Sequence, residues 1–289
     1  MARGYHRLLL LAAAVLFSTG GAAIKATALT GWQVACFRSL VAAVALMALI
    51  PAARQLRHWR VWAAGLAYAA TLILFVTANK LTTSANSIFL QSTAPLYLLL
   101  LGPWLLKEPI RRRDLAFMAV VATGLSLFFF GSERVVATAP NPAAGNLLAV
   151  ISGVTWALTI AGLRWLGRKE SGDQSMAMVA AGNVIAFAVC FPLALPVAQM
   201  SGRDLTVLVY LGVFQIGLAY VCVSKGIREV PAFEASSILL VEPALNPIWA
   251  WMVHGERPSA WALAGGALIL TATLVKSARA RTRNQAEAA

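Results

Sequence analysis

Residues 239–258 read LLVEPALNPIWAWMVHGERP, an apolar stretch with Glu242, Pro243, Asn246 and Pro247 near its middle. A helix rises about 1.5 Å per residue, so about 20 apolar residues cross a hydrocarbon core of about 30 Å. Lipid cannot satisfy a carboxylate at that depth, so such a group faces the protein interior or a water-filled cavity. The stretch therefore predicts a membrane helix whose polar face is turned inward.

The rest of the chain repeats this apolar pattern. Of its 289 residues 60% are hydrophobic and only 12% charged, too few for the surface of a soluble domain of this size. Outer-membrane barrels show short alternating segments, so continuous blocks of this length exclude them. The sequence predicts an all-α membrane protein with ten transmembrane helices and no soluble domain. The ten blocks are roughly 8–27, 32–51, 61–79, 84–106, 114–131, 144–166, 175–198, 204–224, 231–252 and 259–276.

The net charge of +13 is a topology signal. With ten helices, one face holds both termini and eighteen of the 24 lysines and arginines, the other face holds five, and Arg38 lies within a helix. Basic residues concentrate on the cytoplasmic side of membrane proteins, so both termini are predicted to be cytoplasmic. This distribution indicates contact with the lipid bilayer and argues against nucleic acid as a partner. The first block has features of a cleaved signal peptide, but the ten-helix count favours a retained helix.

Two long stretches match when the chain is shifted by 148 residues, 77–109 against 225–257. This shift pairs Lys80 with Arg228, Pro95 with Pro243 and Glu108 with Glu256, and a shift of 139 residues pairs Lys25 with Arg164 and Phe17 with Trp156. The matches predict a duplicated five-helix unit, residues 1–140 and 141–289. Because five is odd, the second unit enters the membrane from the opposite side. Inverted repeats around a central cavity are typical of transporters that work by alternating access.

Three motifs resemble those of a known family. They are EP followed by GE in residues 242–256, AP followed by KEP in residues 94–109, and the arginine of ACFRSLVAAVAL in residues 35–46. In order and spacing they are similar to the ten-helix, EamA-type branch of the drug/metabolite transporter superfamily, and within it to the bacterial aromatic amino acid exporters. The resemblance implies export of small metabolites across the bacterial inner membrane.

The predicted substrate-binding residues form stripes on four helices. On the ninth, Glu242, Asn246 and Trp249 fall at i, i+4 and i+7, on one face. The other stripes are Tyr68, Thr71, Phe75 and Asn79 on the third helix, Ser87 and Gln91 on the fourth, and Trp156 and Thr159 on the sixth. Aromatic walls beside hydrogen-bonding groups suit an amino acid, and the carboxylate would attract its ammonium group or carry a proton. Each of these polar groups has a structural alternative. For the others it is a hydrogen bond between helices, and for Glu242 it is an ion pair across the bundle or a carboxyl group that stays protonated near the kink.

Three prolines in these helices are predicted to kink them, because proline lacks the N–H that a helix needs. Pro95, Pro243 and Pro247 then act as gating elements or as fixed architecture. Arg38 lies about six residues into the second helix, and the favoured interpretation is a side chain that extends to the membrane surface. The alternatives are a structural ion pair or an anchor for a substrate carboxylate. Glu108 and Glu256 are expected to cap helix N-termini or bind nearby cations.

The chain lacks the motifs of other classes of function. The chain has no nucleotide-binding glycine loop, and its three histidines have no metal-ligand spacing, so no cofactor and no metal site are predicted. An intramembrane enzyme would need a cluster of carboxylates or histidines, and a channel would need rings of charge or a filter motif. Doubly anionic substrates such as sugar phosphates would need several cations at mid-membrane depth. Arg38 is the one clear cation there, so phosphorylated substrates are disfavoured.

The sequence therefore predicts a transporter, not an enzyme, that exports small neutral or aromatic amino acids by alternating access. The alternative is a multidrug or general metabolite exporter that acts on aromatic cations, for which Glu242 would be the charge partner. Proton-coupled and passive transport are both compatible with the sequence. A functional monomer is expected because both halves lie in one chain.

Overall fold

The computed structural model describes residues 2–105, 112–130, 136–167, 174–226, 230 and 238–286. Within these ranges the chain is almost entirely helical, and its one extended pairing is an isolated bridge between Val136 and Ala139. The prediction of an all-α fold is confirmed. The predicted capping residue Glu108 lies outside the described ranges.

The helices follow the predicted apolar blocks. In the first half they are α1 (Ala2–Ser18), α2 (Gly20–Lys25), α3 (Gly31–Leu49), the short 3₁₀ helix η1 (Pro51–Arg54), α4 (Trp59–Leu81), α5 (Ser84–Gln91), α6 (Ala94–Leu105) and α7 (Arg112–Phe130). In the second half they are α8 (Pro142–Gly167), α9 (Ser175–Ala194), α10 (Gly202–Val209), the π-helix η2 (Tyr210–Leu218), α11 (Ala219–Gly226), α13 (Val241–His254) and α14 (Ala260–Ala286).

Six helical segments are long and apolar enough to cross a membrane, which makes the chain a membrane protein. They are Gly4–Lys25, Gly31–Leu49, Trp59–Leu81, Pro142–Leu163, Ser175–Ala194 and Gly202–Gly226. Two shorter apolar helices are Asp114–Phe130 and Ala260–Lys276. The blocks around α5–α6 and α13 are divided or shorter, so the total of ten crossings stays a prediction.

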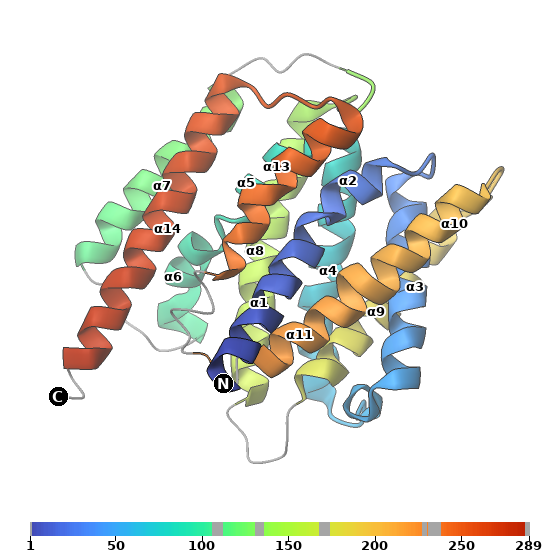
Figure 1. The fold of residues 1–289 in the computed structure, drawn as a ribbon, viewed down its shortest axis with the longest axis horizontal. Helices are drawn as coiled ribbons and strands as arrows, with labels where there is room; N and C mark the ends of the chain where they lie inside the picture. The colour runs from blue at the N-terminus through green and yellow to red at the C-terminus, as the bar shows by residue number, and fades with distance from the viewer. Residues whose placement is uncertain are drawn as a thin grey trace.

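The helices pack around α4, which contacts both α8 and α9, while α9 also packs on α3. On the near face of Figure 1, α1 lies against α11 and α13. Helices α7 and α14 pair with each other at the left of the view. The beginning of α1 and the end of α14 lie at the same end of the bundle (Figure 1). The opposite end, near α2 and the end of α13, is termed the far end.

Two predicted helices are interrupted. The block 84–106 breaks at Ser92 and Thr93, whose hydroxyls donate to the carbonyl oxygens of Ile88 (2.7 Å) and Leu90 (2.5 Å), and α6 then begins with Pro95 in its first turn. The block 204–224 contains the π-helix η2. In a π-helix each backbone N–H bonds to the carbonyl oxygen five residues earlier, instead of four as in an α-helix. Both interruptions bring polar side chains to the bundle interior.

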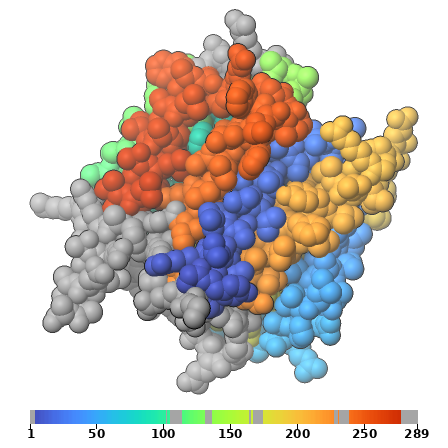
Figure 2. Space-filling view, viewed as in Figure 1, coloured from blue at the N-terminus to red at the C-terminus, as the bar shows by residue number. Residues whose placement is uncertain are grey.

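The outer surface of the bundle is apolar. On α1, Leu8 and Leu11 are exposed (64% and 41%), whereas Leu10, Ala13 and Ala14 on its other face are completely buried. Figure 2 shows α1 running along the seam between α13 and the α10–α11 segment. Tryptophans are enriched where a membrane meets water, and six of those in this chain are exposed, namely Trp32, Trp59, Trp62, Trp104, Trp165 and Trp261. Such a surface suits lipid, where exposed apolar side chains carry no penalty.

Glycines set the distance between α4 and α9. A Cβ atom on Gly182 would lie 2.8 Å from the carbonyl oxygen of Gly65 and 2.5 Å from Cδ1 of Tyr68. Close backbone approach at small residues is how membrane helices gain packing energy, because lipid supplies no hydrophobic drive between them.

We expect Gly182→Ala to lower the free energy of unfolding by about 1–3 kcal/mol, because the added methyl group would push α9 away from α4. The measurement is unfolding of the purified protein in detergent. Gly202→Ala is the matched control, since a Cβ atom there meets nothing within 4 Å. Equal stability of the two variants would show that the α4–α9 contact is looser than described.

Candidate functional site

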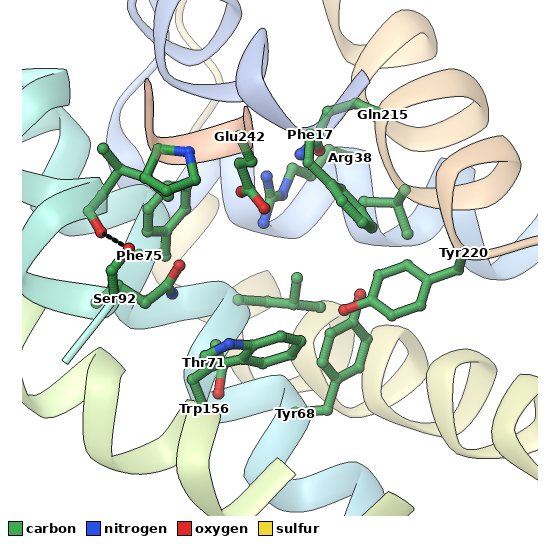
Figure 3. A pocket seen from close by; sticks show the side chains of 15 residues that line it. Phe17, Arg38, Tyr68, Thr71, Phe75, Ser92, Trp156, Gln215, Tyr220 and Glu242 are labelled. Carbon is green, nitrogen blue, oxygen red and sulfur yellow. Dashed lines mark hydrogen bonds between the residues drawn. The ribbon is translucent and has the colours of Figure 1, made fainter. Parts of the chain in front are cut away.

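A cavity of about 120 Å³ lies inside the bundle (Figure 3). It is bordered by α1, α3, α4, α5, α8, η2, α11 and α13, so helices of both halves contribute. Its wall consists of Phe17, Arg38, Tyr68, Thr71, Leu72, Phe75, Ile88, Gln91, Ser92, Trp156, Gln215, Ile216, Tyr220, Glu242 and Pro243. Most of these residues lie in the middle part of the predicted transmembrane blocks, at mid-membrane depth in the predicted topology.

Aromatic rings form much of this wall. Tyr220 makes edge-on contacts with both Phe17 (5.2 Å between ring centroids) and Tyr68 (5.4 Å). In Figure 3, Phe17 lies on one side of the cavity and Tyr68 and Trp156 lie on the opposite side. Flat apolar faces on two sides suit an aromatic or aliphatic group, and they also attract cations through their π-electrons.

The polar side chains of α4 and α8 are held by hydrogen bonds between helices. Thr71 Oγ1 lies 3.0 Å from Thr155 Oγ1 and 3.2 Å from Thr159 Oγ1. Gln91 Nε2 donates to Ser152 Oγ at 2.7 Å, which leaves the amide oxygen of Gln91 without a described partner. Thr71 and Gln91 therefore combine the structural and the cavity-lining roles that the sequence left as alternatives.

Glu242 lies in the first turn of α13 and lines the cavity together with Pro243. Its carboxylate makes no hydrogen bond and no ion pair with any described residue. A carboxylate in such a place needs a proton, water or a cationic ligand. The described residues therefore do not show the ion pair across the bundle that was one structural alternative for Glu242.

Arg38 also lines the cavity, and the expectation that it extends to the membrane surface is wrong. Its side chain is only 2% exposed. The neighbours on the same face of α3, Val34, Ala35 and Ala42, are completely buried, so this face points into the bundle rather than toward lipid. The backbone beside Arg38 is covered by Gly212 of η2, where an added Cβ atom would lie 2.8 Å from the Arg38 carbonyl oxygen.

Six of the predicted binding residues lie in the cavity wall: Tyr68, Thr71, Phe75, Gln91, Trp156 and Glu242. The other five lie outside it. Thr159 is buried behind Thr71, and Asn79 donates to the carbonyl oxygen of Phe75 on its own helix at 3.0 Å. Ser87 is completely buried and its hydroxyl has no described partner.

Asn246 and Trp249 lie on the same stripe as Glu242, but farther along α13. Rises of about 6 Å and about 10.5 Å carry them beyond the cavity. Trp249 Nε1 donates to Ser18 Oγ of α1 at 2.9 Å. Asn246 is completely buried, close to Gly21, and its amide has no described partner.

The three predicted kink residues have different positions. Pro95 follows the break between α5 and α6, Pro243 lies in the first turn of α13 at the cavity, and Pro247 lies inside α13. The cavity residues that sequence reasoning missed include Ser92, Gln215 and Tyr220. Gln215 was detectable, because it is an amide in the middle of an apolar block. No group of three or more potential metal ligands occurs in the described parts of the chain.

A buried ion pair joins the two halves at the far end. Lys25 Nζ lies 2.8 Å from Glu256 Oε1, and both side chains are almost completely buried (3% and 2% exposed). Lys25 also donates to the carbonyl oxygens of Thr82 (2.7 Å) and Thr138. Glu256 Oε2 accepts from the backbone N–H of Ser84 at 2.9 Å, at the beginning of α5. The expectation that Glu256 caps a helix and binds a cation is confirmed.

The chain has counterparts among known proteins along its whole length. A sequence model of the EamA-like transporter family matches it twice, over residues 6–130 and 143–277. The uncharacterized transporter YwfM of Bacillus subtilis (strain 168) is 27% identical over 302 residues, covering 98% of this chain and 97% of that protein. An uncharacterized transporter of Methanothermobacter thermautotrophicus is 22% identical, covering 70% of this chain and 59% of that protein.

One solved crystal structure has a similar fold. It superposes with a TM-score of 0.63 at 20% sequence identity, covering 96% of this chain and 98% of its own. At that identity the likeness concerns the fold alone.

The far-end ion pair predicts a large coupling energy. Lys25→Met or Glu256→Gln leaves a buried charge or its partners unsatisfied, so each should cost about 3–5 kcal/mol of unfolding free energy. The double variant should cost less than the sum, with a coupling of about 1–3 kcal/mol. Unfolding in detergent of the wild type, both single variants and the double variant measures it.

The matched control is the pair Lys276–Asp114, at 3.0 Å but with side chains 31% and 15% exposed. Solvent-exposed pairs contribute about 0–1 kcal/mol. A coupling at Lys25–Glu256 no larger than that of the control pair would contradict the prediction.

Proposed function

The chain belongs to the EamA-like transporter family, and we propose that it exports small neutral and aromatic amino acids across the bacterial inner membrane by alternating access. The observation that carries the proposal is Glu242, an unpaired carboxylate in an internal cavity whose other walls are largely aromatic. An amino acid brings an ammonium group for such a carboxylate and a side chain for the rings.

Alternating access is supported by two observations. The family model matches once in residues 6–130 and once in 143–277, as expected for a duplicated unit with halves 1–140 and 141–289. At the far end the ion pair Lys25–Glu256 joins these halves. It is a contact between two side chains, which can separate and re-form. In the proposed cycle the halves rock around the cavity, with Pro95, Pro243 and Pro247 as sites of bending.

The distribution of charge supports an orientation in the membrane. The basic end of the bundle carries both ends of the chain, so we propose that both termini are cytoplasmic and that the far end faces the periplasm. Export then means uptake into the cavity from the basic end and release at the far end. Because residues of both halves complete one cavity, a monomer is sufficient.

The alternative is export of aromatic cations, and a specific feature favours it. The carboxylate of Glu242 beside the rings of Phe17, Tyr220 and Trp156 is a typical setting for a lipophilic cation. The two proposals differ in whether the substrate carries a carboxylate. An amino acid has one, and an aromatic cation does not.

Transport by purified protein in liposomes tests the function. Vesicles are preloaded with labelled phenylalanine, tryptophan, threonine, methionine, a sugar phosphate or a lipophilic cation, with and without a pH gradient. We expect efflux of the four amino acids above the rate of protein-free vesicles and no efflux of the sugar phosphate. Efflux of the cation alone would replace the proposal with its alternative, and silence across the panel from folded protein would remove both.

Glu242→Gln tests the role of the carboxylate. Removing one partner of a buried charge pair costs about 2 kcal/mol or more, so phenylalanine efflux should fall by roughly 30-fold. If Glu242 also carries protons, the stimulation by a pH gradient should disappear with it. The control is Asp114→Asn, which removes a carboxylate at the partly exposed pair with Lys276. Unchanged rate and pH dependence in Glu242→Gln would exclude a transport role for this residue.

A further inference from the structure

Arg38 is a buried charge whose partner is absent from the described residues. It makes no hydrogen bond or ion pair with them, and its Nε atom is fully enclosed without a partner. Glu242, the only anionic residue in the cavity wall, is not within ion-pair distance. An arginine keeps its charge under physiological conditions, and an uncompensated charge at this depth is expensive.

The position of Arg38 limits how this charge can be compensated. The inward face of α3 prevents the side chain from reaching the membrane surface, and its guanidinium borders the cavity. In Figure 3 Arg38 and Glu242 are on the same side of the cavity, across from Tyr68 and Trp156. No described residue pairs with this guanidinium, so an anion that enters the cavity can serve as its partner.

We propose that Arg38 is the carboxylate subsite of this cavity, which makes a carboxylate a required feature of the transported compound. The planar guanidinium matches the two oxygens of a carboxylate, and bidentate pairing is the strongest form of this contact. Among the described residues of the wall, Arg38 is the only lysine or arginine, so it suits one carboxylate better than a doubly charged phosphate. The inference rests on the proposed function and adds a specificity that the Glu242 carboxylate alone would not give.

This role separates two compounds that share an aromatic ring and an ammonium group. Phenylalanine carries a carboxylate, whereas phenylalaninamide carries a neutral amide in its place. With Arg38 as the subsite, the wild-type protein exports phenylalanine in preference to phenylalaninamide. A cation exporter would have the opposite preference, because protonated phenylalaninamide has a net positive charge and phenylalanine has none.

The test is efflux of both compounds from liposomes containing wild type, Arg38→Gln or Arg38→Lys. In Arg38→Gln, phenylalanine efflux should fall by roughly 30-fold, the change expected for a lost buried charge pair, with phenylalaninamide efflux unchanged or increased. Arg38→Lys should give an intermediate ratio, because it keeps the charge but loses bidentate geometry. The matched control is Arg54→Gln, at an exposed arginine that donates to backbone carbonyls of Met47 and Ala48, which should keep the wild-type ratio.

A second measurement needs no variant, and so it decides the matter even if Arg38→Gln does not fold. Hydrocinnamate has the ring and the carboxylate without the ammonium group, and phenethylamine has the ring and the ammonium group without the carboxylate. Hydrocinnamate should compete with phenylalanine efflux by wild-type protein. Competition by phenethylamine alone would overturn the inference.

The outcomes distinguish this inference from the proposed function. If wild type exports phenylalanine but Arg38→Gln keeps the wild-type ratio of phenylalanine to phenylalaninamide, the subsite is wrong and the function stands. If wild type exports phenylalaninamide but not phenylalanine, both fall. A chloride dependence of phenylalanine efflux that is lost in Arg38→Gln, with the wild-type ratio of phenylalanine to phenylalaninamide kept, would show that an inorganic anion is the partner of Arg38, and would also overturn the subsite.

Discussion

Lipid offers no hydrogen bonds, and this constraint determines where every polar side chain of the bundle lies. The buried Thr71, Ser152 and Thr159 bond across α4 and α8, and the far-end ion pair satisfies the first N–H of α5. The two charged side chains that find no partner in the described chain, Glu242 and Arg38, both border the cavity. Among the charged groups, pairing thus separates the far-end ion pair, which holds the fold, from the two groups that are available to a ligand.

Close packing is the other side of the same constraint. Because lipid is as apolar as the helices, contact area and short backbone distances must supply the cohesion that water supplies in soluble proteins. The glycines at the α4–α9 crossing serve this purpose, and Gly124 and Gly265 do the same where α7 meets α14. The α4–α9 contact also positions Tyr68, so the wall of the cavity depends directly on the packing behind it.

Much of the fold was predictable because hydropathy over 20 residues is a strong signal. The predicted blocks coincide with helices, and Glu242, Trp156 and Tyr68 were found as polar or aromatic residues at depth. The direction of each helix face was harder to predict. Around Arg38, α3 is apolar on every side, so periodicity does not tell which face meets lipid. Trp249 shares a face with Glu242, but sequence spacing does not say where along that face the cavity ends.

The π-helix η2 has a further consequence, for the comparison of related sequences. A π-helical segment accommodates a residue that an α-helix of the same length would not, and removing one residue rotates the remainder of the helix by about 100°. Gln215 lies within this segment and Tyr220 comes after it, whereas Leu208 precedes it and packs in the core. A relative that differs by a single residue here would keep the bundle and the packing of its first half-helix. It would nevertheless present different side chains to the cavity.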